Sequence, residues 1–415
     1  MKIWLTQIGE ILPLQANIRM MRVGYLAERL NLRGHDVVWW ASAFDHMQKK
    51  MLFPEDREIE TRPGLKIRAL TSRGYKKNIS LSRCLDHLLL AEKMAKSFRC
   101  SAPPDIIVAS MPDHWTAYQA VKYAKRMNIP VLVDVRDEWP DVFLNLVSPM
   151  FRPFMRHILI AEYQKVSYLL RNATGILSMM QYMMQWALDK AGRMETWKDR
   201  VFYLGSRYAN KSPNAPVPEK FMKVAHRLNG QCVVTFIGTM GSYYNPRILV
   251  KVAKMMGDKD KVFFIIAGNG LHFDELHKYS RDCDNVFMPG WLSEPEIQYL
   301  LSISHIGVIP CTESIQTFPN KAYTYLSAGL PILSSVEGEL GKLIAEKQCG
   351  FTYPVGDQES LAVLIDKLVM DADLRMAMAQ RAAKVFKDHY DADIIYNEFA
   401  EHVENIAREQ QKTLN

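Results

Sequence analysis

The stretch from Phe318 to Ser335 has the pattern of an anion-binding corner in an α/β protein. Its apolar spacing predicts a short helix at 323–328, which ends at a glycine and leads into a buried strand at 331–335. Another apolar strand, 306–310, precedes this stretch, so the helix N-terminus should project from the carboxyl edge of a parallel sheet. Free N–H groups and the helix dipole favour anions at such an edge. Lys321, at the helix start, is therefore a candidate for binding a diphosphate.

Two charged residues follow another predicted strand, 131–135, just before a proline. Charged side chains at the carboxyl end of a strand lie in a binding site more often than in a core. Asp137 could accept a hydrogen bond from an acceptor hydroxyl, and Arg136 could neutralise a phosphate, so both are catalytic candidates. A structural ion pair between the two is the alternative. His114, which follows the preceding strand, is an acceptor-side candidate at the same edge.

The loop after the first strand holds a further group of polar residues. It contains only Gly9 and is therefore no dinucleotide-binding fingerprint. Asn17, Arg19 and Arg22 lie at or after the start of the next helix, where they could meet a donor diphosphate or an acceptor. We assign these three residues to the part of the site that would bind an acceptor molecule. Ordinary surface charge is the alternative for the two arginines.

Glycines follow two apolar strands in the second half of the chain. Gly238 comes directly after 232–237, and Gly268 directly after 262–267. Because glycine lets the backbone approach a ligand closely, both are candidates for contact with a phosphate.

These residues need a scaffold, and apolar runs alternate with helix-period segments along the chain, as in parallel βα units. In the first half we expect strands near 2–7, 36–41, 66–70, 105–109, 131–135, 174–178 and 201–204, with helices that include 18–33, 85–98, 113–126 and 151–171. The second half should contain strands near 232–237, 262–267, 285–288, 306–310 and 331–335, then helices near 358–370, 373–388 and 391–409.

Two βα series of similar size predict an α/β fold with two doubly wound domains facing each other across a cleft. A proline-rich segment, 206–219, separates the two series. We therefore assign a first domain to 1–205, a linker to 206–230, a second domain to 231–390 and a final helix to 391–415.

The composition is that of an ordinary globular protein, with 48% hydrophobic and 23% charged residues among 415. Its six cysteines show neither a C-x-x-C pair nor metal-ligand spacing, so we expect reduced thiols and no metal site. The sequence has no run of 18 apolar residues and no signal-peptide pattern at its start. A cytoplasmic protein is the expectation.

Positive charge is concentrated in two places, although the net charge is only +7. Between Glu60 and Asp86 there are seven basic residues and no acidic one, and 150–160 combines arginines with Phe and Met. Such surfaces suit the anionic face of a membrane, and a solvated face over an ordinary helix is the alternative. No nucleic-acid motif accompanies the charge, so no nucleic-acid partner is expected.

Several motifs together resemble family 4 retaining glycosyltransferases. Arg22–Leu30 matches the R-x-x-x-L-A-x-x-L helix of that family, and Leu30–Val38 is typical of the first βαβ unit in the GT-B fold. Arg136–Pro140, with the pattern R-D-x-W-P, is similar to the subset that builds bacterial surface polysaccharides. The resemblance spans nearly the whole chain and is strongest between Val262 and Val355.

The resemblance implies two Rossmann-like domains, a final helix that crosses back onto the first, and retaining transfer without a metal or other cofactor. It implies that the backbone near Trp291 and Leu292 contacts the nucleobase. Asn320 and Lys321 match the polysaccharide subset, with Lys321 as the main diphosphate cation.

Other family positions are changed in this chain. The two glutamates that contact the sugar and the ribose are replaced by Gln316 and Thr324, and Glu313 lies three residues before the first of them. The family's Arg/Lys pair is also missing, because Thr239 and Tyr244 stand at its positions. Arg247 and Lys321 could substitute for that pair.

The sequence therefore predicts a metal-independent glycosyltransferase that moves a hexosyl-type sugar from a nucleoside-diphosphate donor to a hydroxyl acceptor. The basic segments suggest a lipid-linked acceptor in bacterial polysaccharide assembly and peripheral association with the inner face of the membrane. A non-catalytic GT-B protein that binds a glycan or a partner is the alternative, and a sugar-nucleotide epimerase of the same fold is a third possibility.

Overall fold

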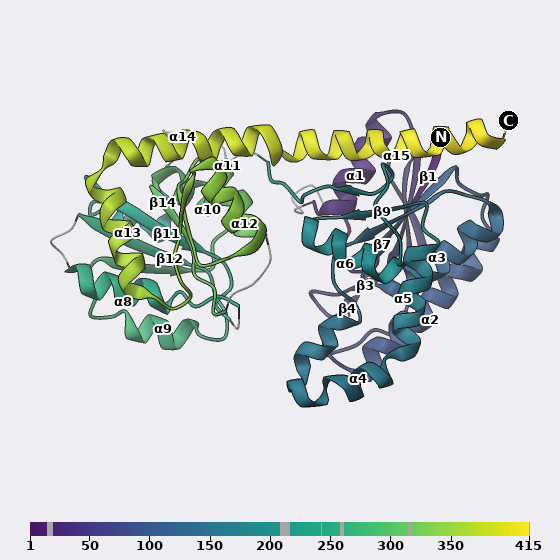
Figure 1. The fold of residues 1–415 in the computed structure, drawn as a ribbon, viewed down its shortest axis with the longest axis horizontal. Helices are drawn as coiled ribbons and strands as arrows, with labels where there is room; N and C mark the ends of the chain where they lie inside the picture. Colours follow the sequence, from purple (N-terminus) through teal and green to yellow (C-terminus); the bar gives the residue numbers. More distant parts are fainter. Residues whose placement is uncertain (15–19, 208–215, 242, 258–260, 314–317, 415) are drawn as a thin grey trace. The chain divides into compact units, whose positions relative to one another are not determined.

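The computed structural model describes residues 1–14, 20–207, 216–241, 243–257, 261–313 and 318–414. The chain divides into two compact units: the first comprises 1–203 and 395–415, and the second comprises 204–394. Each unit contains its own sheet with helices on both faces (Figure 1).

The first unit is built on an eight-stranded sheet in the order β10-β9-β8-β7-β1-β2-β6-β5. Its strands are β1 (Lys2–Thr6), β2 (Asp36–Ser42), β5 (Arg57–Arg62), β6 (Leu65–Leu70), β7 (Ile106–Met111), β8 (Val131–Val135), β9 (Gly175–Ser178) and β10 (Arg200–Val201). All neighbours are parallel except β5 and β6, and at the centre Leu5 pairs with Trp39 on one side and Val108 on the other. A separate antiparallel ribbon joins β3 (Phe44–Asp45) to β4 (Lys50–Met51).

The helices of this unit are α1 (Arg22–Leu32), α2 (Leu81–Arg99), α3 (His114–Met127), α4 (Arg152–Ile158), α5 (Ile160–Arg171), α6 (Gln181–Ala191) and most of α15 (Ala392–Leu414). Two 3₁₀ turns, at Asp141–Leu146 and Pro149–Phe151, precede α4. Helices on both faces bury nearly all of the central strands β1, β7, β8 and β9, which explains why those strands are largely apolar in the sequence. Trp4, Trp40 and Phe98 form an aromatic centre with ring centroids 5.0–5.1 Å apart.

Helix α15 joins the first unit although it follows the whole of the second in sequence. The Phe399 ring stacks on Phe202 with centroids 4.5 Å apart, and Glu404 accepts from Arg33 at 2.6 Å. Both contacts link the end of the chain to residues near or before position 203, so α15 is part of the core of the first unit.

The second unit contains a six-stranded, fully parallel sheet in the order β13-β12-β11-β14-β15-β16. Its strands are β11 (Cys232–Ile237), β12 (Val262–Ala267), β13 (Val286–Gly290), β14 (Ile306–Ile309), β15 (Ile332–Ser334) and β16 (Gly350–Thr352). Its helices are α7 (Met222–Ala225), α8 (Arg247–Met256), α9 (Phe273–Tyr279), α10 (Glu294–Ile303), α11 (Asn320–Ser327), α12 (Gly338–Lys347), α13 (Gln358–Met370) and α14 (Ala372–His389), preceded by a 3₁₀ turn at Glu219–Phe221.

The expected elements lacked β3, β4, β5 and β16, and one expected helix is two helices in the structure. Strand β5 was not predicted, because Arg57–Arg62 is polar at most positions and forms the edge of the sheet, where burial does not impose an apolar pattern. The single helix expected at 151–171 is divided into α4 and α5 at Leu159, whose ψ of 8° interrupts the helical geometry.

Candidate functional site

At the carboxyl edge of the second sheet, two glycines bring the ends of β11 and β12 into close contact. Gly238 and Gly268 have φ angles of +143° and +133°. A Cβ on Gly268 would lie 1.9 Å from the carbonyl oxygen of Gly238, so no larger residue fits there. Packing between strand ends therefore accounts for Gly268, and phosphate contact at either glycine stays a prediction.

The side chain of Lys321 lies over this edge. A Cβ on Gly238 would be 2.5 Å from Cε and Nζ of Lys321, and the ammonium lies 3.3 Å from the ring centroid of Tyr244. Within the described residues, no carboxylate oxygen lies within 4.0 Å of Nζ of Lys321, the limit for an ion pair. Burial lowers the pKa of Lys321 to about 8. A desolvated cation at a strand end and a helix N-terminus can accept an anion.

Tyr325 holds Lys321 in this place. It lies one helical turn further along α11, and its hydroxyl accepts the backbone N–H of Ile237 at 3.0 Å. Its ring occupies the space where a Cβ on Gly307 would come within 2.5 Å. The helix is thus fastened to the end of β11 and to β14, which fixes the position of its first turn.

A cavity of about 310 Å³ lies at the same edge and includes Arg247. Its walls are formed by Gly241, Tyr244, Asn245, Pro246, Arg247, His272, Glu275, Leu276 and Thr312. The Arg247 guanidinium is already paired with Glu275 and lies 4.4 Å from the ring centroid of Tyr279. A ligand that binds Arg247 would have to compete with this exposed ion pair, which costs little because such pairs are weak.

The other donor-side candidates are placed as follows. Thr239 and Glu313 are exposed, and Asn320 is the exposed first residue of α11. Thr324 donates its hydroxyl to the carbonyl of Asn320 at 3.4 Å. Gln316 lies outside the described residues.

The predicted nucleobase contacts differ strongly in exposure. Trp291 is 69% exposed, whereas Leu292 is 5% exposed and packs in a core cluster with Phe221 and Phe263. The Leu292 side chain is therefore a packing residue, and only its backbone is open to the predicted role.

In the first unit, Arg136 forms an ion pair with Glu10 rather than with Asp137. Glu10 also accepts the backbone N–H of Val23 at 3.0 Å, in the first turn of α1. This network ties the end of β8 to the first loop and to α1. The alternative of an Arg136–Asp137 pair is thereby wrong.

Asp137 is half-buried beside this network. One of its carboxylate oxygens accepts the backbone N–H of Glu138 at 2.9 Å. Burial raises the pKa of Asp137, and the nearby positive charge of Arg83 partly opposes that effect. The carboxylate keeps acceptor capacity for a hydroxyl group.

Asp137→Asn is expected to increase stability at neutral pH. Because the folded pKa is raised, the native state binds more protons than the unfolded state between the two pKa values, and stability falls as pH rises through that window. Asparagine removes this loss while it keeps an acceptor oxygen. Urea unfolding of both proteins at about pH 4 and about pH 7 measures the effect. A variant less stable than the parent at the higher pH would contradict it.

Arg22, an acceptor-side candidate, is a structural residue. Its side chain is buried, and its guanidinium donates to Asp134 of β8 at 2.8 and 2.9 Å and to the carbonyl of Phe202 at 2.6 Å. It also lies 5.0 Å from the ring centroid of Phe399. The prediction of a ligand contact fails because Arg22 has no exposed surface for one.

His114 is also buried, at the start of α3. Its Nε2 lies 2.6 Å from a carboxylate oxygen of Glu162, and its ring packs against Trp115 and Trp139. Its Nδ1 has no hydrogen-bond partner among the described residues. A role toward an acceptor stays a prediction for His114, while Asn17 and Arg19 lie outside the described residues.

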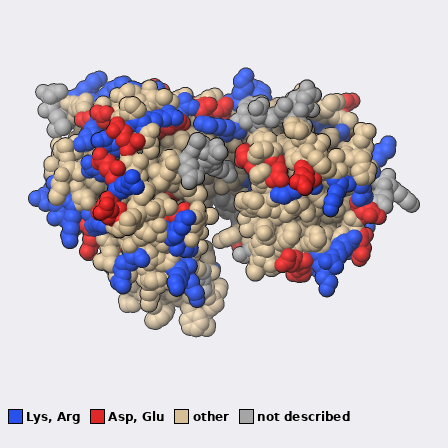
Figure 2. Space-filling model, turned by 180° about the vertical axis from the view of Figure 1, so that it is seen from behind, with Lys and Arg blue, Asp and Glu red and all other residues tan. Residues whose placement is uncertain are grey.

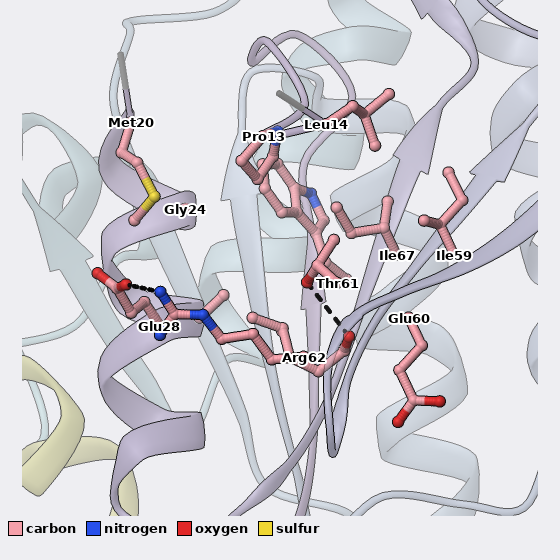
Figure 3. A pocket seen from close by; sticks show the side chains of 13 residues that line it. Pro13, Leu14, Met20, Gly24, Glu28, Ile59, Glu60, Thr61, Arg62 and Ile67 are labelled. Atoms are coloured by element: carbon pink, nitrogen blue, oxygen red, sulfur yellow. Dashed lines mark hydrogen bonds and ion pairs between the residues drawn. The ribbon is translucent and has the colours of Figure 1, made fainter. Parts of the chain in front are cut away.

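A second cavity, of about 420 Å³, lies between α1 and the β5–β6 edge of the first unit (Figure 3). Trp39, Ile59 and Ile67 line it, and the Arg62–Glu28 ion pair, 2.7 Å long, closes one side. None of the residues predicted from the sequence lines this cavity. Residues of β5 form part of its wall, and β5 was not predicted from the sequence.

Sequence reasoning missed two residues that shape the donor side. Tyr244 was noted only as the loss of a lysine, yet its ring is the main neighbour of the Lys321 ammonium. Tyr325 was read as part of an amphipathic helix. The spacing of Lys321 and Tyr325, one turn apart, is the signal that could have linked them.

Comparison with known proteins addresses the fold and the second unit. Residues 218–385 match the family model described as glycosyl transferases group 1. No match was found among curated protein sequences.

Solved structures are similar over the whole chain. Anabaena HepE in complex with UDP is 16% identical, with 97% of this chain and 99% of that chain covered and a TM-score of 0.66. Sucrose-phosphate synthase from Thermosynechococcus elongatus is 15% identical, with 98% of each chain covered and a TM-score of 0.67. WaaG, a glycosyltransferase involved in lipopolysaccharide biosynthesis, is 12% identical, with 97% and 99% covered and a TM-score of 0.61. These likenesses confirm the predicted GT-B fold.

Proposed function

We propose that the chain is a family 4 retaining glycosyltransferase that moves a hexosyl-type sugar from a nucleoside-diphosphate donor to a hydroxyl acceptor. The observation that carries the proposal is the half-buried Lys321 ammonium, which has no carboxylate partner among the described residues. The family match over 218–385 and the likeness to the HepE structure in complex with UDP support it.

The second unit binds the donor in this proposal. The diphosphate lies at the N-terminus of α11, where Lys321 and the helix dipole neutralise the charge that develops as the bond to the sugar breaks. Asn320 adds hydrogen-bonding capacity at the same helix end. A metal ion is not required, because these groups supply the positive charge.

The first unit binds the acceptor. The acceptor hydroxyl attacks the anomeric carbon from the face that the diphosphate leaves, and its proton passes to the departing phosphate oxygen. Asp137 accepts a hydrogen bond from the acceptor and orients it. Such a reaction needs no enzymic nucleophile.

Titration of the purified chain with nucleoside diphosphates and their sugars tests the proposal. We expect saturable binding of one nucleotide class by calorimetry and slow hydrolysis of its sugar in the absence of acceptor. Binding without hydrolysis or transfer would favour the non-catalytic alternative, and the absence of nucleotide binding would overturn the proposal.

We further propose a lipid-linked acceptor in bacterial polysaccharide assembly, reached from the inner face of the membrane. No helix in the described part of the chain is long and apolar enough to cross a bilayer. At the end of the first unit, however, Met150, Phe151, Phe154 and Ile158 expose more than half of their surface around α4. We call these four residues with Arg152 and Arg156 the α4 face.

The charge of the α4 face suits an anionic lipid surface. No acidic residue occurs in 142–161, so nothing in this segment opposes the two arginines. Figure 2 shows uncharged surface at the lower end of the first unit, where Figure 1 places α4, with Lys and Arg above it. Apolar side chains can enter the interface while the arginines remain at the level of the phosphates.

Arg152→Gln combined with Arg156→Gln is expected to weaken binding to phosphatidylglycerol vesicles about thirtyfold, since each basic residue contributes about 1 kcal/mol near an anionic surface. Cosedimentation with vesicles measures this. Lys96→Gln with Arg99→Gln removes the same charge from the far end of α2 and should have little effect. Equal binding of the parent protein to phosphatidylglycerol and phosphatidylcholine vesicles would contradict the role of the α4 face.

A further inference from the structure

Three basic side chains converge on Tyr75 in the first unit. Tyr75 is buried, and the Lys49 ammonium and Arg83 guanidinium lie 4.8 and 5.6 Å from its ring centroid. Nδ1 of His46 lies 2.5 Å from the Tyr75 hydroxyl and 3.4 Å from Nζ of Lys49. The residues come from the turn between β3 and β4, the loop after β6 and the first turn of α2, so the fold brings them together. We call His46, Lys49 and Arg83 the basic cluster.

Among the described residues, no carboxylate forms an ion pair with the two cations of the basic cluster. Within the described residues, no carboxylate oxygen lies within 4.0 Å of the nitrogens of Lys49 or Arg83. The nearby Asp45 accepts two backbone N–H groups of its own turn, at 2.8 Å each. Lys49 donates to the side-chain oxygen of Asn78, and Nη1 of Arg83 donates to the Asn78 carbonyl at 2.8 Å. The two cations therefore donate hydrogen bonds to neutral oxygens of Asn78 rather than to carboxylates.

The crowding of positive charge has an electrostatic cost. Burial, followed by the charges of Lys49 and Arg83, lowers the pKa of His46 to about 4. Burial and the charge of Arg83 also lower the pKa of Lys49. Like charges in a partly desolvated site repel each other, and an anion bound among them would remove that cost.

Hydrogen-bonding capacity in the basic cluster is also unused. Nε of Arg83 is buried without a partner among the described residues. Neutral His46 accepts at Nδ1 from the Tyr75 hydroxyl, which leaves its Nε2–H as a donor. Two cations and a neutral donor form a set suited to the oxygens of a phosphate or diphosphate.

Its surroundings connect the basic cluster to the acceptor. The Arg83 guanidinium lies 5.7 Å from the ring centroid of Trp139. Its positive charge also opposes the rise in the pKa of Asp137 that burial causes. Ile79 and Leu81, which shortly precede Arg83 in the chain, are exposed. The basic cluster is thus near both the candidate acceptor-binding carboxylate and two exposed apolar side chains.

We propose that Lys49, Arg83 and His46 bind the phosphate or diphosphate group of the acceptor. The proposal rests on the proposed function and adds an anionic group to the acceptor that Asp137 orients. It assigns a role to Arg83, which the sequence showed only as part of a basic stretch, and to His46 and Lys49, which lie outside that stretch.

Inorganic pyrophosphate is the probe, titrated calorimetrically into the full chain carrying Lys321→Ala, which removes the donor-side cation. In that background, Arg83→Gln and Lys49→Gln should each weaken pyrophosphate binding at least about tenfold, as the loss of a charged hydrogen bond requires. Lys96→Gln, which removes an equal charge from α2, should leave the affinity unchanged. Lys49 lies in a surface turn, so its variant remains informative if Arg83→Gln does not fold.

Two results would overturn the proposal. One is that pyrophosphate does not bind in the Lys321→Ala background, and the other is that the Arg83 and Lys49 variants bind pyrophosphate as tightly as the Lys321→Ala protein does. Nucleotide-sugar binding to the chain with Lys321 intact is measured separately and should not change with Arg83→Gln. If it is absent altogether, the proposed function fails. If nucleotide-sugar binding persists while substitution of Arg83 and Lys49 leaves pyrophosphate affinity unchanged, only the proposed acceptor subsite is wrong.

A second arm identifies the source of the anion. Farnesyl diphosphate should bind more tightly than pyrophosphate if the acceptor is lipid-linked, and Leu81→Ser should remove that advantage, because Leu81 is 88% exposed beside the basic cluster. Equal affinities for the two probes, both sensitive to Arg83→Gln, assign the subsite to a water-soluble phosphate.

Discussion

Lys321→Ala is expected to raise the Kd for a nucleoside diphosphate roughly tenfold to 150-fold. The side chain is half-buried at the strand end, where a charge-assisted hydrogen bond to a phosphate is worth about 1.5–3 kcal/mol. The structure offers no described carboxylate that would compete with the ligand for this ammonium. Calorimetric titration with UDP, or with the nucleotide that the parent binds best, measures the change.

Lys254→Ala is the matched control for this experiment. The Lys254 ammonium also lies over a tyrosine ring, 3.8 Å from the centroid of Tyr279, but its side chain is exposed on α8. Its removal should leave nucleotide affinity unchanged. Equal affinity of the parent and Lys321→Ala would refute the assignment of the diphosphate to this helix end.

The same lysine predicts how donor binding depends on pH. Because burial lowers the pKa of Lys321 to about 8, the free protein loses this charge as pH rises through about 8. Nucleotide affinity should therefore fall in that range for the parent protein, and the fall should be absent from Lys321→Ala.

Arg22→Ala is expected to reduce the free energy of unfolding by about 3–5 kcal/mol, because it leaves Asp134 buried without its partner. Urea or guanidinium unfolding, followed by circular dichroism, measures the loss. The physical cause is desolvation of an unpaired carboxylate in the middle of the first sheet. Nucleotide binding by the folded variant should be unaffected, since Arg22 belongs to the first unit.

Two further variants separate this cause from a general effect of losing charge. Arg126→Ala removes an exposed arginine from the last turn of α3 and should change stability only slightly. Replacing both partners, Arg22→Met with Asp134→Leu, should be less destabilising than Arg22→Ala alone, because no charge stays buried. A loss below 1 kcal/mol for Arg22→Ala would contradict the structural role.

Much of the fold could be predicted because parallel strands are covered on both faces. Val262–Ala267 is apolar throughout and Cys232–Ile237 is apolar except for Thr235, and each is a strand in the structure. The glycine that ends each of these two strands marked the edge at which Lys321 is found. The sequence thus predicts which residues lie near the carboxyl ends of strands.

Depth of burial was harder to predict for charged residues. Arg22 was assigned to a ligand, although it shares a helix face with Leu26 and Leu30, and both leucines are buried. Asp134 likewise stands alone in the apolar strand Val131–Val135. Each observation was available, but their pairing joins residues 112 positions apart, which no local pattern reveals.

The basic cluster could not be predicted for a related reason. The sequence showed Arg83 within a stretch of positive charge, but not that Lys49 from another turn meets the same tyrosine. Charge density in a sequence gives the sign of a surface, whereas convergence on one ring depends on the tertiary fold.

The position of α15 has a consequence for biosynthesis. The second unit is one continuous segment, 204–394, and can fold as soon as that segment has left the ribosome. The first unit lacks a core helix until 395–415 have left the ribosome, so its earlier residues cannot complete their core before the second unit has been made. Nascent chains that end before α15 should therefore expose Phe202, the partner of Phe399, and depend on chaperones until α15 has been made.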